Sequence, residues 1–258
     1  MNTNVQLDIA DISISFGGIQ ALTEVSFQIP AGGLAAIIGP NGAGKTTIFN
    51  CICSVYKPDI GDILLDGESL KALKPHKVAE KGIARTFQNI ELFAELTVID
   101  NLMLGRHLHN GSGILSGALF YGKAVREEVS HRKRVEEIID FLEIEQVRKK
   151  KVINLPYGIQ KRVELGRAIA MDPKVLLLDE PTSGMNVEET EDMARFVLDI
   201  KEEMGTTILM VEHDMGVVMD LAEKIMVLDF GLKIAEGTPE EVQNNPKVIQ
   251  AYLGEDAA

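Results

Sequence analysis

The stretch that decides the fold is a run of nine residues after the apolar segment Leu34 to Ile38: Gly39, Pro40, Asn41, Gly42, Ala43, Gly44, Lys45, Thr46 and Thr47. An apolar strand, a glycine-rich turn and Gly-Lys-Thr at the start of a helix make up the complete phosphate-loop pattern. The glycines let successive backbone N–H groups converge on phosphate oxygens, and the positive end of the following helix points at the same anion. The sequence therefore predicts a nucleotide-binding loop and not a turn that merely joins a strand to a helix.

Two side chains of this loop have distinct expected roles. The ammonium group of Lys45 is expected to reach the β- and γ-phosphates of the nucleotide. Mg²⁺ prefers hard oxygen ligands and keeps several waters, so the hydroxyl of Thr46 is the expected protein ligand beside it. The loop therefore predicts a nucleotide bound together with Mg²⁺.

Length and composition favour an ordinary globular chain. Its 258 residues fit one large α/β domain, and fractions of 45% hydrophobic and 25% charged residues are typical of a soluble protein. No apolar run approaches the roughly 20 residues that span a bilayer, and the N-terminus shows no secretory signal pattern, so we expect a cytoplasmic location. The net charge of −13 argues against nucleic acid as the main partner.

The apolar pattern predicts two kinds of strand. Residues in Ile12 to Phe16 and in Val25 to Ile29 alternate between apolar and polar, which indicates half-exposed antiparallel strands. The runs Leu34 to Ile38, Val175 to Leu178 and Ile208 to Val211 are continuously apolar, as in parallel strands covered on both faces. We therefore expect a mixed sheet together with an antiparallel part.

The middle of the chain predicts helices. Little strand pattern is present between Gln88 and Leu155, and Gly105 to Gly122 is a glycine-rich stretch that we expect to be a flexible loop. One helical face is marked by apolar residues at spacings of 0, 3, 4 and 7, namely Val135, Ile138, Ile139 and Leu142. Near the end of the chain, Thr238 to Glu241 is a capping box, and a further short helix starts at Pro246.

Two acids follow the second of the continuous apolar runs. Asp179 and Glu180 come directly after Val175 to Leu178, which is the Walker B arrangement when a phosphate loop is also present. The first carboxylate orients Mg²⁺ and the second polarises an attacking water. At the carboxyl end of a parallel strand, both lie where α/β sheets bind their ligands.

Two more polar residues occupy comparable positions. His213 follows the apolar run Ile208 to Val211 and is expected to contact the γ-phosphate or the lytic water. Gln88 lies where sheet gives way to the helical segment, and its amide oxygen is expected to join the Mg²⁺ shell. A lone histidine or glutamine carries little meaning, so the interpretation depends on the neighbouring phosphate loop.

Together these residues resemble the nucleotide-binding subunit of ATP-binding cassette (ABC) transporters, from Phe16 to the C-terminus. The resemblance implies an α/β phosphate-loop NTPase fold in a single ATP-binding domain, residues 1–258. It implies a RecA-like mixed-sheet core with C-terminal helices (1–88 and 166–258), an N-terminal antiparallel β subdomain, and an inserted helical subdomain (89–165). ATP and Mg²⁺ are the implied ligands, and Glu180, His213 and Gln88 the implied catalytic residues.

The resemblance also assigns roles to residues outside the phosphate loop. Phe16 is the implied adenine-stacking aromatic, and the implied Mg²⁺ ligands are Thr46, Gln88 and Asp179. The signature segment corresponds to Leu155 to Gln160, and the D-loop to Ser183 to Asn186.

Two departures from the family pattern bear on the partner subunit. The family signature LSGGQ closes over the γ-phosphate of the opposite subunit, whereas here the segment contains Pro156 and Tyr157 and retains Gly158 and Gln160. Pro156 removes the serine hydroxyl and a backbone donor, while the helix dipole remains. Asn186 replaces the usual D-loop aspartate. We therefore expect an asymmetric pair in which contact to the partner's ATP is weaker or differently made.

The same segments resemble the LivG-type ATP-binding subunit of branched-chain amino acid importers. The similarity includes the Tyr-Gly-x-Gln signature, Arg85 to Gln88, Val211 to Met215, and the segment from Glu236 to Gly254. The resemblance implies a second ATP-binding subunit, two membrane permeases and an extracytoplasmic solute-binding protein as partners. It places the chain on the cytoplasmic face of the membrane.

Two alternatives remain open at this stage. The same type of subunit serves importers of urea, amides or other amino acids, and cargo selection lies in the permeases and binding protein. A non-transport ABC ATPase acting on ribosomes or DNA is a different class. It requires two cassettes, or a coiled-coil insertion and basic surfaces, and the sequence shows neither.

Overall fold

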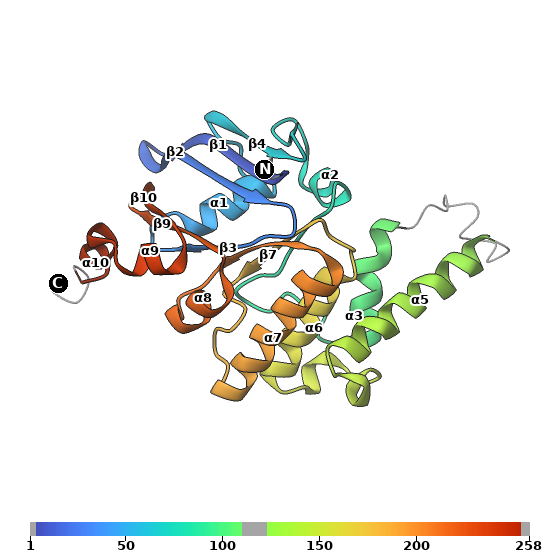
Figure 1. Cartoon of the computed structure of the whole chain (residues 1–258). Coiled ribbons are helices and arrows are strands. Elements are labelled where there is room, and N and C mark those ends of the chain that lie inside the picture. Colours follow the sequence, from blue (N-terminus) through green and yellow to red (C-terminus); the bar gives the residue numbers. More distant parts are fainter. Residues whose placement is uncertain (1–3, 110–122, 254–258) are drawn as a thin grey trace.

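The chain is built on a six-stranded sheet with the strand order β10-β9-β3-β8-β7-β6. Figure 1 labels β10, β9, β3 and β7 of this sheet. The structure is a computed structural model and describes residues 4–109 and 123–253. Strands β9, β3, β8, β7 and β6 run parallel to their neighbours, whereas β10 is antiparallel to β9. The strands are β3 (Leu34–Ile38), β6 (Ile83–Arg85), β7 (Val175–Asp179), β8 (Thr207–Val211), β9 (Lys224–Asp229) and β10 (Leu232–Gly237).

A second, antiparallel sheet has the order β2-β1-β4-β5 and comes from the first seventy residues. Its strands are β1 (Val5–Phe16), β2 (Ile19–Pro30), β4 (Ile60–Leu65) and β5 (Glu68–Ser69). Antiparallel strands at the N-terminus and a mixed sheet in the core confirm the fold class predicted from the apolar pattern.

The central strands are covered on both faces. Every residue of β3, β7 and β8 is buried. Successive residues of β3 alternate between two hydrophobic clusters: Leu34, Ala36 and Ile38 join one, and Ala35 and Ile37 the other. The second cluster includes the antiparallel sheet and helix α1, and the first includes the helices on the opposite face. This double burial explains why the strands read as continuous apolar runs.

Nine α-helices and three 3-10 helices pack around the sheets in the described residues. The α-helices are α1 (Lys45–Ile52), α2 (Pro75–Glu80), α3 (Val98–Gly105), α5 (Lys123–Phe141), α6 (Tyr157–Ile169), α7 (Val187–Met204), α8 (Met215–Leu221), α9 (Pro239–Gln243) and α10 (Pro246–Leu253). The 3-10 helices are η1 (Arg106–His109), η2 (Glu145–Val147) and η3 (Val152–Asn154). No helix among these residues is both long enough and apolar enough to cross a membrane.

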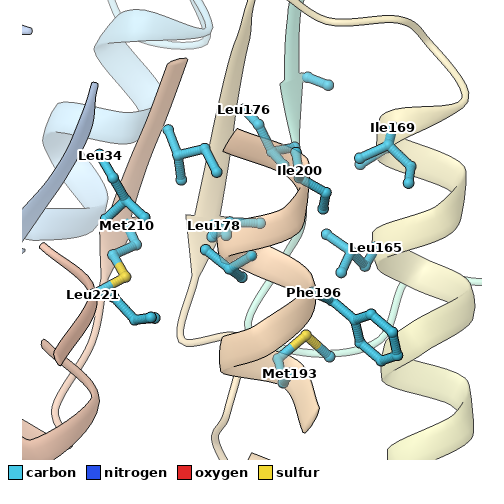
Figure 2. Close-up of a cluster of buried hydrophobic side chains, with 14 of the residues drawn as sticks. Leu34, Leu165, Ile169, Leu176, Leu178, Met193, Phe196, Ile200, Met210 and Leu221 are labelled. Carbon is cyan, nitrogen blue, oxygen red and sulfur yellow. The ribbon is translucent and has the colours of Figure 1, made fainter. Parts of the chain in front are cut away.

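Helices α6 and α7 cover one face of the six-stranded sheet. Figure 2 shows Leu165 of α6 and Phe196 of α7 among the side chains that pack toward Leu176 and Leu178 of β7. Burial of such side chains contributes roughly 1.5–3 kcal/mol each relative to exposure. The packing fixes α6 against the strand that carries the two acids.

The middle of the chain is helical, as predicted. No named strand occurs between Gln88 and Leu155 in the described residues, and only one isolated bridge joins Thr97 to Lys151. The predicted apolar stripe on α5 is fully buried. Of the expected flexible loop, Gly105 ends α3 and residues 106–109 form η1, while residues 110–122 lie outside the described part. The subdomain boundaries at 88/89 and 165/166 remain predictions.

The predicted C-terminal capping box is present. The Thr238 side chain accepts a hydrogen bond from the Glu241 backbone N–H, the Glu241 side chain accepts one from the Thr238 N–H, and Pro239 occupies the first turn. Helix α10 follows and ends at Leu253.

The apolar stripe of α5 provides a test of the fold. We expect Ile138→Ala to lower the free energy of unfolding by about 2–5 kcal/mol, because its side chain is fully buried and leaves a cavity. Lys133→Ala, on the exposed face of the same helix, is the matched control and should change it by less than about 0.5 kcal/mol. Chemical denaturation measures both, and equal effects of the two substitutions would contradict the packing.

Candidate nucleotide-binding and catalytic site

Four polar loops converge on one edge of the six-stranded sheet. Strands β3, β8, β7 and β6 are neighbours and parallel, so their carboxyl ends share that edge. They are followed by the phosphate loop, by His213, by Glu180 and by Gln88, respectively. The sheet topology therefore brings together residues that lie up to 174 positions apart.

Two glycines of the phosphate loop are required by its geometry. Gly39 has a φ of +148°, and a Cβ there would lie 2.0 Å from the carbonyl oxygen of Leu228. Gly44 has a φ of +106°, and its Cβ would lie 2.8 Å from Cδ2 of Leu22. Only glycine fits both backbone conformations without displacing its neighbours. The loop is thus packed tightly between β9 and β2.

The lysine of the loop lies inside it. Lys45 is 6% exposed, and its Nζ donates to the carbonyl oxygens of Gly39 and Pro40 at 2.5 and 2.9 Å. Helix α1 begins at this lysine, and its N-cap Gly44 makes no side-chain capping bond. Thr46 is exposed in the first turn of the helix. A cation and a helix N-terminus at the same point favour the binding of phosphate oxygens.

Of the three residues assigned to catalysis, Gln88 and His213 both contact Glu180. Gln88 Nε2 donates to Glu180 Oε2 at 2.9 Å, and His213 Nε2 lies 2.8 Å from Glu180 Oε1. Glu180 has a φ of +49°, a conformation that non-glycine residues rarely adopt, and its side chain is 14% exposed. Both carboxylate oxygens are therefore held in place, although the catalytic roles themselves remain predictions.

Asp179 has a partner that sequence reasoning missed. Its carboxylate is 5% exposed and accepts a hydrogen bond from Arg85 Nη2 at 2.6 Å. Arg85 also donates to Asn50 at 2.7 Å, and its guanidinium lies over the ring of Phe87. The sequence offered one signal for this contact: Arg85 is a charged residue that ends an otherwise apolar strand, three positions before Gln88. Arg85 fixes the Walker B aspartate to the start of the Gln88 segment.

Glu212 is a second residue that sequence reasoning missed. It is 3% exposed, and its Oε1 accepts from Thr182 N at 3.0 Å and from Thr182 Oγ1 at 2.5 Å. Its Oε2 accepts from the backbone N–H groups of His213 and Asp214 at 2.9 and 3.4 Å. The side chain thus ties the loop that follows Glu180 to the loop that carries His213.

The expected Mg²⁺ ligands fit the chemistry of that ion. Thr46, Gln88 and Asp179 offer a hydroxyl, an amide oxygen and a carboxylate. Asp179 ends β7, whereas Thr46 and Gln88 follow β3 and β6, and these parallel strands end at the same edge of the sheet. Within the part of the chain that the structure describes, no group of three or more His, Cys, Asp or Glu side chains forms a metal site. A Mg²⁺ ion that keeps water and phosphate oxygens as ligands needs few protein ligands.

Phe16 is a partly exposed aromatic residue at the end of a strand. It ends β1, is 43% exposed, and its ring meets the ring of Tyr56 edge-on with centroids 4.9 Å apart. The adenine-stacking role of Phe16 remains a prediction, and Tyr56 is a neighbour that sequence reasoning did not identify.

The signature segment contacts the D-loop of its own chain. Pro156 is the N-cap of α6, the Tyr157 hydroxyl donates to the carbonyl oxygen of Ser183 at 3.1 Å, and Gln160 donates to Leu155 at 2.8 Å. A Cβ on Gly158 would lie 2.2 Å from Oε1 of Glu189. Tyr157 therefore provides a direct link between the two segments.

Asn186, the departure from the usual D-loop aspartate, caps helix α7. Its side chain accepts from the Glu189 N–H at 3.0 Å, and the Glu189 side chain accepts from the Asn186 N–H at 3.1 Å. Because Glu189 also lies against Gly158, the cap brings the start of α7 next to the signature segment.

The architecture that gathers these loops on one edge, with an antiparallel sheet on one side and helices on the other, is that of an ATP-binding cassette. The model of the ABC transporter family matches residues 22–183, and that of a branched-chain amino acid ATP-binding cassette transporter family matches residues 233–258. A solved structure, the ADP conformation of the cassette MJ1267, superposes with a TM-score of 0.84 at 32% identity, covering 97% of this chain and 99% of MJ1267.

Two curated relatives align over almost their full length. BraF of Pseudomonas aeruginosa, a high-affinity branched-chain amino acid transport ATP-binding protein, is 40% identical over 252 residues, covering 96% of this chain and 98% of BraF. LivG of Escherichia coli, described in the same words, is 38% identical over 249 residues with the same coverage. The chain belongs to the ABC transporter family, within the group of LivG and BraF, which confirms the resemblance found in the sequence.

Glu212 provides a test of the site. Both of its oxygens face donors, so Glu212→Gln places an NH₂ group against N–H groups and loosens the His213 loop. We expect kcat for ATP hydrolysis to fall on the order of tenfold, with the KM for ATP unchanged because the phosphate loop is untouched. Glu240→Gln, an exposed position on α9, is the control. An unchanged kcat in folded Glu212→Gln protein would contradict this role.

Proposed function

We propose that this chain is the ATP-binding and ATP-hydrolysing subunit of a membrane importer for branched-chain amino acids. The observation that carries the proposal is the carboxylate of Glu180 held between Gln88 and His213 at the edge where the phosphate loop lies. BraF and LivG are 38–40% identical to this chain over nearly its whole length, and both are described as branched-chain amino acid transport ATP-binding proteins, which supports branched-chain amino acids as the cargo.

Binding of ATP depends on the phosphate loop. The loop amides and Lys45, whose Nζ already lies against the loop carbonyls, take up the phosphates, and Phe16 stacks on the adenine. Thr46, Gln88 and Asp179 would hold Mg²⁺, which would supply positive charge to neutralise the phosphates of the nucleotide. Arg85 keeps Asp179 directed toward the same edge.

Hydrolysis depends on Glu180. Its carboxylate accepts a proton from the attacking water as the water oxygen bonds to the γ-phosphorus, and the bond from that phosphorus to the bridging oxygen breaks to give ADP and phosphate. Gln88 and His213 fix the two carboxylate oxygens. The left-handed backbone at Glu180 aims the side chain into the site.

The proposed partners follow from the resemblance, in which the signature segment meets the nucleotide of a second subunit. We propose that ATP joins this chain head to tail with a second ATP-binding subunit, whose nucleotide meets Pro156, Tyr157, Gly158 and Gln160. Because Pro156 offers neither a hydroxyl nor an N–H group, the pair is asymmetric and this chain's own site contributes more. Two permease subunits and an extracytoplasmic solute-binding protein complete the importer, with this chain on the cytoplasmic face of the membrane. Nucleic acid is not a partner, given the net charge of −13.

The catalytic assignment is tested by Glu180→Gln. We expect hydrolysis by the assembled importer to fall by at least about a hundredfold, because the amide cannot accept the proton, while ATP still binds. Phosphate release and nucleotide binding are measured in parallel. Glu188→Gln, an exposed residue in the first turn of α7, is the control. Unchanged hydrolysis by Glu180→Gln would show that another residue is the base.

The cargo is tested in the cell. We expect deletion of the gene to abolish high-affinity uptake of leucine, and the wild-type gene, but not the Lys45→Ala variant, to restore it. Uptake of radiolabelled leucine, isoleucine, valine and urea is measured side by side. Normal leucine uptake with loss of another solute would overturn the proposed cargo and leave the ATPase assignment intact.

A further inference from the structure

We propose that Lys161 and Glu164 are positioning residues for ATP hydrolysis, which hold the backbone around Gln88 and so set Gln88 against Glu180. The proposal rests on the ATPase function proposed above and assigns to helix α6 a role in the active site of its own chain. The two residues and the segment they hold, residues 87–91, are called the α6 clamp below.

The two side chains of the α6 clamp form a buried ion pair on one face of α6. Lys161 and Glu164 are three positions apart, their side chains are 2% and 1% exposed, and Nζ lies 3.6 Å from Oε2. Burial raises the pKa of Glu164, whereas the charge of Lys161 and backbone N–H groups lower it. A buried pair of this kind stabilises a fold no better than apolar side chains of similar volume. The ion pair therefore contributes to function through the backbone groups that it contacts.

Both residues bind the backbone of the Gln88 segment. Lys161 Nζ donates to the carbonyl oxygens of Gln88 and Phe87 at 3.0 and 3.3 Å. Glu164 Oε1 accepts from the N–H groups of Phe87 and Glu91, both at 3.4 Å. Residues 86–93 form neither helix nor strand, so side chains supply the bonds that a sheet or helix would otherwise provide.

Arg167 extends the same face by another turn. Its Nη1 donates to the carbonyl oxygen of Glu91 at 2.5 Å. Lys161, Glu164 and Arg167 are spaced three residues apart and together hold the segment from Phe87 to Glu91. The position of this segment is thus set by α6.

The clamp is one of two routes from α6 to Glu180. On the first route, Lys161 holds the Gln88 carbonyl, and the Gln88 side chain donates to Glu180. On the second, Tyr157 donates to the Ser183 carbonyl, and the Ser183 N–H donates to the Glu180 carbonyl at 3.2 Å. One turn of helix separates Tyr157 from Lys161. A displacement of the signature end of α6 therefore moves both supports of Glu180 together.

The test is a double-mutant cycle in the complete importer, reconstituted in liposomes. Lys161→Met with Glu164→Leu replaces the pair by apolar side chains and preserves the burial. We expect kcat for ATP hydrolysis to fall on the order of tenfold, with the KM for ATP unchanged. Combined with Gln88→Ala, the same pair of substitutions should cause no further loss, because the clamp acts through Gln88. Lys201→Met, which removes an ion-paired lysine from α7, is the matched control.

Two further variants separate positioning from folding. Glu164→Gln keeps an acceptor oxygen for the two N–H groups and should retain most of the activity. Arg167→Met releases only the Glu91 end and should lower kcat by a smaller factor, again without effect in the Gln88→Ala background. The thermal midpoint of each variant is recorded, and if the apolar pair fails to fold, Arg167→Met decides the outcome.

Two results would overturn the proposed role of the α6 clamp while leaving the proposed function intact. One is a wild-type kcat in the folded variant that carries Lys161→Met and Glu164→Leu. The other is a further loss of kcat when these substitutions are combined with Gln88→Ala. A wild-type importer that does not hydrolyse ATP would overturn the proposed function and the clamp with it.

Discussion

The parallel pairing of β3, β8, β7 and β6 is the constraint on which the rest of the structure depends. Because the strands run in the same direction, each of the four loops that follow them opens at the same edge of the sheet. The pairing is stable because both faces are covered, by the antiparallel sheet with α1 on one side and by helices on the other. Any slip of one strand would remove one of the four loops from the site.

The site is then held by charged side chains buried just below it. Arg85, Glu212 and the Lys161–Glu164 pair each join two loops or helices that are distant in sequence. Burying such groups costs free energy that their hydrogen bonds and ion pairs offset, so loss of these contacts by displacement is costly. The left-handed backbone at Glu180 adds a local cost of about 1–3 kcal/mol, which the surrounding bonds offset. The loops at this edge are therefore joined to one another by polar contacts in addition to the apolar core.

The sequence predicted the apolar core better than the buried polar contacts, because the two depend on different residues. Continuous apolar runs, the stripe on α5 and the capping box at Thr238 depend on neighbouring residues and could be predicted from the chain. Gln88, Glu180 and His213 could be proposed because each follows a strand in a known pattern. The roles of Arg85, Glu212, Lys161 and Glu164 could not be predicted. They depend on contacts with Asp179, Thr182, Gln88 and Phe87, respectively, which lie 30 to 94 positions away, and an isolated charge on a helix or strand usually faces solvent.

The signature segment shows how a departure from the family pattern is absorbed. Pro156 fits at the N-cap of α6 because its fixed φ of −56° suits that position and an N-cap N–H is not needed for the helix. Tyr157 adds a hydroxyl that reaches the Ser183 carbonyl of the same chain. Pro156 supplies no hydroxyl at this position, while the Tyr157 hydroxyl bonds the signature segment to the loop after Glu180. Helix α6 is therefore attached to Glu180 from two directions, through Tyr157 with Ser183 and through Lys161 with Gln88.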